Sequence, residues 1–425
     1  MNESKVSEKS RVPVDLKRVY ARPTAFLPLD SAMPSQSVSA PQGDARRASI
    51  HAALLAVQRE TAKINANLTH YMVSNSELND SLRRLQGFVA NADDLLACEL
   101  APLDGLHQQP AGALTEISGD PTEGRALDHV IYDTYFKVVR ISAMTISQFT
   151  AQVVATCRAM LRDLPFAVLG MDQVLGLTET IQAMIEFLAR RFASGEEDYP
   201  SPDENNISIP DDSAQQEFWL TKPETSSRQL DDRTGRVAFY RWCVGHHFFN
   251  LSSIFCASHL SGAGKAMEKS DEERAAKLIK QAGQFIRGLT AAMFYAANFP
   301  SEVYRGVIRE SMMVTGAPHG FSGSQNADYS LLKTIKTDFM QRLAKSYGSD
   351  TSIWPPAVLA AVRTFQELDV QDSEHHVLLA AYKVGADSSL SQKTWHGRLP
   401  AQARVKNAVD ILRDMAEHKR RQYQI

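Results

Sequence analysis

Apolar residues recur at helical spacing along most of this chain, and no stretch alternates between apolar and polar residues as a half-buried strand does. The helical pattern begins near Ala48 and continues in segments that Pro- and Gly-bearing loops separate. No internal repeat of about 20–50 residues is present. The sequence therefore predicts an all-α fold, in which an N-terminal helical region packs on a large helical bundle.

Composition divides the chain into three parts. Residues 1–45 mix Ser, Pro, Ala and charged residues without periodicity, which predicts a flexible N-terminal arm. Residues 46–125 are expected to form an N-terminal helical region that ends in a Pro- and Gly-bearing loop, and residues 126–425 to form the main helical domain. Residues 195–232 of that domain are acidic and rich in Pro and Ser, so we expect an exposed loop there.

Long helices are expected throughout the main domain. Apolar residues from Tyr135 to Phe149 keep helical spacing, which predicts one buried helix running to about Leu161, before Pro165 breaks the pattern. The densest apolar segment, FYRWCVGHHFFNLSSIFCASHL, predicts a buried helix near the centre of the protein. Further helices are expected at about 172–193, 270–298, 326–347, 355–369, 373–385 and 401–422.

Charge and hydropathy argue against two classes of function. The chain has 46 basic and 49 acidic side chains, a formal net charge of −3, and no basic run that would mark a nucleic-acid or membrane surface. No apolar run reaches the length of a membrane span, and the charged N-terminus lacks the apolar core of a signal peptide. We therefore expect a cytoplasmic protein. Its cysteines have no CxxC spacing and are expected to be free, buried and reduced: Cys98, Cys157, Cys243 and Cys256.

A candidate binding segment runs from Tyr304 to Lys333. Its first part, YRGVIR, places an aromatic residue five positions before Arg309, and a small-residue loop, GAPHGFSGS, follows. Because burying an unpaired guanidinium costs several kcal/mol, Arg309 must find an anion. Two partners are possible: a carboxylate of the protein, such as Glu302 or Glu310, or the carboxylate of a substrate held as a bidentate clamp.

Two pairs of adjacent histidines lie in apolar helical segments. His375 and His376 precede the run VLLAAY, and a helical histidine that faces an apolar slot suits axial ligation of haem. The alternative is a hydrogen-bonded core or capping residue. His246 and His247 point about 100° apart on a helix, so at most one of them faces a given site. Core and proton-handling roles are both open for them, whereas His259 is expected to be structural.

Several common catalytic motifs are absent. The sequence has no HExxH, no paired ExxH for a carboxylate-bridged di-iron site, no P-loop and no glycine-rich dinucleotide fingerprint. The segment GFSGSQ follows no strand, so it is not a nucleophile elbow, and neither Ser322 nor Ser324 is a candidate nucleophile. The sequence therefore assigns no catalytic acid, base or nucleophile.

Taken together, these segments resemble the superfamily of histidine-ligated haem proteins that contains tryptophan and indoleamine 2,3-dioxygenases. They are most similar to its monodechloroaminopyrrolnitrin synthase branch, over about residues 235–390. In that family a substrate helix carries an aromatic residue five positions before the arginine that holds the amino-acid carboxylate, as Tyr304 and Arg309 stand here. A Gly/Ser-bearing loop over the haem resembles Gly320 to Lys333, and HHVLLAAYKVG resembles the helix of the proximal histidine.

The resemblance implies a haem b group whose iron is ligated by His376, with His375 as the alternative register. It places Arg241 to His246 where the family lines the distal pocket, and Gly323 and Ser324 at the haem edge. The residues implied to bind substrate are Arg309, Tyr304, Gly323, Ser324 and His246.

Two features depart from the family pattern. The segment ADSSLSQKTWHGRLP follows Gly385 in place of the Gly/Ser-rich segment that closes over the substrate in the dioxygenases. Asp372 and Ser373 stand where relatives have an arginine ahead of the proximal histidine. The first departure weighs against cleavage of the tryptophan ring, and the second weighs against haem ligation.

The resemblance implies a haem-dependent oxygenase that oxidises an indole- or tryptophan-like substrate with O₂ or peroxide. Two alternatives are a secondary-metabolite enzyme that rearranges a substituted tryptophan, and a non-catalytic helical binding protein that retains the fold. A homodimer or homotetramer is compatible with the sequence, and no nucleic-acid or membrane partner is expected.

Overall fold

A computed structural model describes residues 24–28, 44–70, 74–103, 121–141, 144–194, 232–314, 325–384 and 408–423. Most of these residues are helical, which confirms the predicted all-α class. The longer helices are α2 (Asp44–Thr69), α3 (Asn75–Leu100), α4 (Pro121–Phe136), α5 (Ile146–Asp163), α6 (Met171–Ser194), α7 (Asp232–Glu268), α8 (Glu272–Ala296), α11 (Ala327–Tyr347), α12 (Pro356–Val384) and α13 (Ala408–Tyr423). The shorter ones are η2 (Leu164–Phe166), α9 (Ser301–Val303), η3 (Tyr304–Ile308), α10 (Arg309–Val314) and η5 (Thr351–Ile353).

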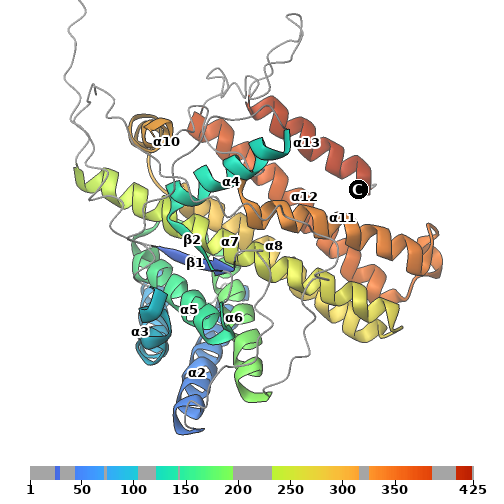
Figure 1. Cartoon of the computed structure of the whole chain (residues 1–425), viewed down its shortest axis with the longest axis horizontal. Helices are drawn as coiled ribbons and strands as arrows, with labels where there is room; N and C mark the ends of the chain where they lie inside the picture. The colour runs from blue at the N-terminus through green and yellow to red at the C-terminus, as the bar shows by residue number, and fades with distance from the viewer. Residues whose placement is uncertain are drawn as a thin grey trace, which may run out of the picture.

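Helices α7 and α8 run side by side through the middle of the molecule (Figure 1). On one side, α8 packs on α6, which packs on α2, while α3 joins α2 to α5. On the other side, α8 packs on α12 and α7 packs on α11, and α13 lies along α12. The N-terminal helices and the C-terminal helices therefore meet across the α7–α8 pair.

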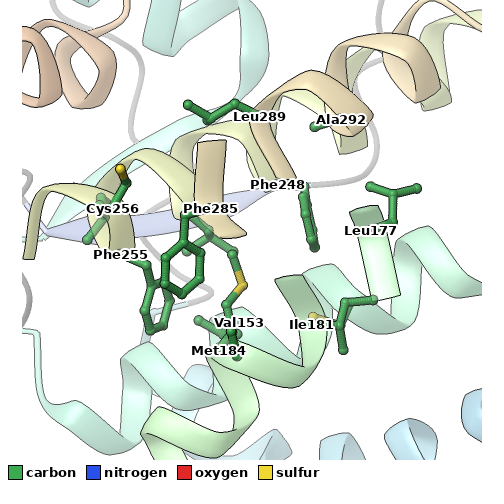
Figure 2. Close-up of a cluster of buried hydrophobic side chains, with 14 of the residues drawn as sticks. Val153, Leu177, Ile181, Met184, Phe248, Phe255, Cys256, Phe285, Leu289 and Ala292 are labelled. Carbon is green, nitrogen blue, oxygen red and sulfur yellow. The ribbon is translucent and has the colours of Figure 1, made fainter. Parts of the chain in front are cut away.

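Part of the buried apolar core lies where α5, α6, α7 and α8 meet, and Figure 2 shows side chains from these helices packed there. The rings of Phe255 and Phe285 stack 5.3 Å apart at 21°, and Phe187 meets Phe255 edge to face at 5.4 Å. All three side chains are buried. Burial of one such side chain stabilises the fold by about 1.5–3 kcal/mol, so this cluster fixes α7, the helix that carries His246.

The single helix predicted from Tyr135 to about Leu161 is wrong at residues 137–141. Helix α4 ends at Phe136, Lys137 adopts a left-handed conformation (φ 54°), and Val138–Ile141 forms strand β2. This strand pairs in parallel with β1 (Ala25–Pro28), which lies within the predicted N-terminal arm and is buried. The run VVRI is rich in β-branched residues and fits a strand as well as a helix, so only the partner strand decides between them.

The helices predicted at 355–369 and 373–385 form one continuous helix, α12. The polar residues between them do not end it, because the buried side chains of Asp369 and Asp372 both find hydrogen-bond donors there. The helices predicted at 172–193 and 326–347 agree with α6 and α11 to within a residue or two.

The cysteines only partly match the prediction that all four are free and buried. All four cysteines are free and three are buried, whereas Cys98 is exposed, contrary to prediction. Among the described residues, no helix combines the length and the apolarity that crossing a membrane requires. Nearly all of the predicted loop at 195–232 lies outside the described residues.

Candidate functional site

The segment with Tyr304 and Arg309 contains a π-helical turn. Between α9 and α10, the backbone N–H of Arg309 donates to the carbonyl oxygen of Tyr304, a bond that spans five residues. In an α-helix two such residues would point about 140° apart, and the wider turn brings their side chains closer to one face. Burial raises the pKa of the Tyr304 phenol, and the neighbouring charge of Arg309 opposes that rise. The two side chains therefore lie near each other.

Arg309 is half-buried, and within the described residues no carboxylate pairs with it. Glu302, one of its possible partners, lies 3.6 Å from Arg305 instead. Arg241 is the opposite case. Its guanidinium binds Asp163 at 2.6 Å and donates to backbone carbonyls, so groups of the protein already satisfy it. Of these two arginines, only Arg309 is available to an added anion.

His246 of α7 lies in an aromatic cluster with Phe136 and Trp242. Its ring stacks on Phe136 at 4.0 Å and 18°, and lies 4.3 Å from Trp242. The Nδ1–H donates to the carbonyl oxygen of Trp242 at 2.6 Å, which leaves Nε2 with its lone pair. Burial lowers the pKa of His246 to about 3, so the imidazole is neutral at neutral pH. The indole of Trp242 also meets Tyr304 edge to face at 5.9 Å.

His247 and His259 have structural surroundings. The Nε2–H of His247 donates to the carbonyl of Phe136 at 2.6 Å, and the Nδ1–H of His259 donates to that of Phe255 at 2.7 Å. Both side chains are buried, and burial lowers each pKa to about 4. Of His246 and His247, only His246 faces the aromatic cluster, because adjacent residues of a helix point about 100° apart.

His376 of α12 has a solvent-exposed side chain, yet the protein around it still desolvates it and lowers its pKa. The negative charge of Asp372 opposes that shift, and the charge of His376 in turn lowers the pKa of His246. The two imidazoles, on α12 and α7, are therefore close enough to interact.

His375 points elsewhere on α12. Its ring meets Phe294 of α8 edge to face at 5.4 Å, and its Nδ1 is buried without a hydrogen-bond partner among the described residues. Leu378 and Tyr382, which share its helical face, are exposed. The two histidines thus differ: His375 packs against α8 at the edge of an apolar face, and His376 faces the side where His246 lies.

A buried ion-pair network fixes the start of α11. Arg140 of β2 binds Asp133 of α4 and Asp328 of α11, with the closest N–O distance 2.8 Å in each pair. Next to it, the amide of Asn326 donates to the hydroxyl of Tyr132 at 2.9 Å. The residues that follow the predicted Gly/Ser loop are therefore tied to α4, the helix whose Phe136 stacks on His246.

Four of the predicted site residues are related in the structure. Tyr304 and Arg309 share the π turn, Trp242 contacts both Tyr304 and His246, and the charge of His376 acts on His246. Gly323 and Ser324 lie outside the described residues. Trp242 was not among the residues predicted to bind substrate. Its position one helical turn before His246, in an aromatic run, was the available signal.

Comparison with known proteins places this chain in a family. A model of the SfmD 3-methyl-L-tyrosine peroxygenase family matches residues 27–350, well over half of the chain. The chain belongs to this family. A crystal structure of reduced SfmD soaked with sodium hydrosulfite is similar at 17% identity and a TM-score of 0.47, covering 85% of this chain and 98% of that one. No curated protein matches the sequence.

The match to the SfmD 3-methyl-L-tyrosine peroxygenase family covers some of the site and not all of it. Tyr304, Arg309 and His246 fall within the matched residues, whereas His375 and His376 of α12 lie beyond them. The finding names a peroxygenase family, where the motifs suggested dioxygenases and the synthase branch. That narrower relationship stays a prediction.

Proposed function

We propose that this protein is a haem-dependent enzyme that transfers oxygen from peroxide to the ring of an aromatic amino acid. Membership of the peroxygenase family supports the reaction class. The observation that carries the proposal is the half-buried guanidinium of Arg309, which has no carboxylate partner among the described residues and is joined by the π turn to an aromatic side chain.

Arg309 would hold the carboxylate of the amino acid. A guanidinium offers a planar pair of N–H donors that matches a carboxylate, and a partly buried site strengthens the pairing. Tyr304, fixed by the same turn, would pack beside the substrate ring, and Trp242 would extend that aromatic wall toward His246. The wall would orient the ring and exclude water from it.

The residues present on α12 fit a haem. His376 offers an accessible imidazole with no hydrogen-bond partner among the described residues, and a buried carboxylate lies one turn before it. When bound, haem supplies the redox-active iron that activates peroxide or O₂. His246 is neutral and keeps an unprotonated Nε2, which could accept a hydrogen bond or a proton. Gly323 and Ser324 remain proposed haem-edge residues.

The family name points to a tyrosine-like ring, whereas the sequence motifs pointed to an indole. An aromatic wall of Tyr304 and Trp242 accommodates either ring, because stacking and edge contacts depend on the π face rather than on one polar group. We therefore propose the wider class, aromatic α-amino acids, with oxygen transfer from peroxide as the reaction.

The clamp is tested by comparing two arginines of one segment. Arg309→Leu is expected to weaken binding of L-tyrosine or L-tryptophan to the hemin-loaded protein by at least tenfold, because a charge-assisted pair contributes about 1.5–3 kcal/mol. Arg305→Leu is the control, since Arg305 is exposed and pairs with Glu302. Calorimetry reports both affinities. Equal affinities in the two variants would disprove the clamp.

The haem ligand is tested by titrating the protein with hemin. A Soret band that saturates at one haem per chain, and that His376→Ala but not His375→Ala abolishes, supports the proposed register. Loss in His375→Ala alone assigns the other histidine. A flat spectrum for the wild-type protein removes the oxygenase and supports a helical binding protein.

Products separate the remaining reaction classes. Oxygen transfer from peroxide adds one oxygen atom to the amino acid and releases water, ring cleavage by O₂ adds two, and rearrangement of a substituted tryptophan adds none. Mass spectrometry after incubation with L-tyrosine, L-tryptophan and hydrogen peroxide distinguishes these outcomes. A product with one added oxygen is expected.

A further inference from the structure

A buried carboxylate lies one helical turn before His376. The side chain of Asp372 is 4% exposed, and its position four residues earlier on α12 puts it on the same helical face. Side chains on a helix lean toward its N-terminus, so the imidazole of His376 extends over the turn that contains Asp372. The charges of the two side chains interact.

Asp372 is held from a second helix. The hydroxyl of Thr290 on α8 donates to its Oδ1 at 2.7 Å, which fixes the orientation of the carboxylate. This is its one hydrogen bond among the described residues, so the carboxylate can still accept from another donor. The imidazole N–H of His376 is on the correct face to be that donor.

The neighbouring carboxylate, Asp369, is already satisfied. Lys336 lies 2.8 Å from its Oδ1, Lys419 lies 3.1 Å from the same atom, and Tyr423 donates to its Oδ2 at 2.9 Å. Two buried carboxylates on adjacent turns of α12 thus have different roles. Asp369 binds α11 and α13 together, whereas Asp372 keeps accepting capacity on the side of His376.

We propose, resting on the proposed function, that Asp372 is a positioning residue for the iron ligand, accepting the second ring N–H of His376. Such a bond fixes the tautomer and the orientation of the ring and increases its electron donation to a bound metal.

The test compares two carboxylates of α12 in the hemin-binding protein. Asp372→Asn removes the buried charge and keeps the shape, and it is expected to weaken hemin affinity by about tenfold. Glu374→Gln removes a charge from the same helix, but Glu374 pairs with Arg420 on α13 and lies on another face, so its affinity is expected to stay within about twofold of wild type.

Measuring the reduction potential of the bound haem separates an effect on the orientation of His376 from a loss of folding. A carboxylate hydrogen bond to the ligating imidazole favours ferric iron, so Asp372→Asn should raise the reduction potential while Glu374→Gln leaves it unchanged. Thr290→Val keeps the charge of Asp372 but releases its orientation, and it should weaken hemin binding in the same direction even where Asp372→Asn folds poorly.

The outcomes distinguish this inference from the proposed function. If wild-type protein binds hemin through His376, but Asp372→Asn matches Glu374→Gln in affinity and potential, the positioning role is wrong and the haem site stands. If wild-type protein binds no hemin, or His376→Ala keeps its Soret band, the assignment of the ligand fails and the role of Asp372 fails with it.

Discussion

The α7–α8 centre and the α11–α13 end of the molecule are held together by different interactions. At the centre, phenylalanine rings and close helix contacts fill the space, and Gly245 and Gly288 let backbones approach within van der Waals distance of Ala296 and Thr180. At the α11–α13 end, buried charges make the contacts, with Asp369 linking three helices. Apolar packing is non-directional, whereas ion pairs fix the angles at which helices meet.

The two regions therefore position different helices of the site. The apolar centre sets the position of α7, and with it His246 and Trp242, while the ionic end sets the rotation of α12, and with it His376. A site that uses His246 and His376 together requires both regions. Substitutions that disturb one region and not the other therefore test whether the two are separable.

The largest effect is expected from breaking the ionic end. Asp369→Asn leaves the buried amine of Lys336 and the half-buried amine of Lys419 without their carboxylate, and loss of one partner from a buried pair costs about 3–5 kcal/mol. Asp338→Asn, at an exposed pair with Arg342, should cost less than about 1 kcal/mol. Urea denaturation measures both free energies of unfolding. Similar losses in the two variants would show that the buried pair fixes nothing.

Acid should affect the two regions in separate pH windows. His247 and His259 have pKa values of about 4 in the folded state, against 6.5 unperturbed, so the unfolded state binds more protons between these values. Stability is then full above pH 6.5 and falls toward pH 4, by about 1.4 kcal/mol per pH unit for each histidine. Asp369, with a pKa of about 2, contributes stability above 3.8 that is lost only below it.

Denaturation at several pH values between 7.5 and 4.5 tests this order. His259→Gln keeps a donor for the carbonyl of Phe255 and should reduce the slope by about 1.4 kcal/mol per pH unit. An unchanged slope would mean that His259 is protonated in the folded state. The apolar centre is thus expected to be the first region that mild acid weakens.

The sequence predicted the helical class and most helix positions because long amphipathic periods survive any tertiary context. The prediction failed where a short segment is compatible with both a helix and a strand. VVRI fits a helix or a strand, and its strand partner lies more than a hundred residues earlier, at Ala25–Pro28. Asp369 and Asp372 led to the prediction that the helix is interrupted there. Their hydrogen-bond partners, on α8, α11 and α13, are distant in the chain and cannot be recognised from the sequence.

The candidate site was predictable to a similar extent. Spacing singled out Tyr304 and Arg309, and the histidine pairs were visible as polar residues in apolar helices. The π turn that relates Tyr304 to Arg309 has no sequence signature of its own, and Trp242 becomes part of the site only because α7 runs beside η3. The role of Arg241 also required the position of Asp163, 78 residues away.

A smaller effect is expected from widening the apolar centre. In Gly245→Ala the new Cβ would lie 2.5 Å from the Cβ and 2.8 Å from the Cα of Ala296, so α7 and α8 must separate. Overpacking of this kind costs about 1–3 kcal/mol. Because His246 is the next residue, hemin affinity should fall as well. A stable variant with unchanged hemin affinity would show that the close contact is not needed to position His246.

The smallest effect on stability is expected from a glycine-to-alanine substitution at a position where the new methyl group contacts nothing. Gly87 is exposed in the middle of α3, and a Cβ there would meet no atom within 4 Å. Alanine has the higher helix propensity, so Gly87→Ala should stabilise the protein by about 0.5–1 kcal/mol and leave hemin affinity unchanged. Thermal and urea denaturation measure the gain. Opposite signs at Gly87 and Gly245 would show that the destabilisation at the centre comes from the α7–α8 contact and not from helix propensity.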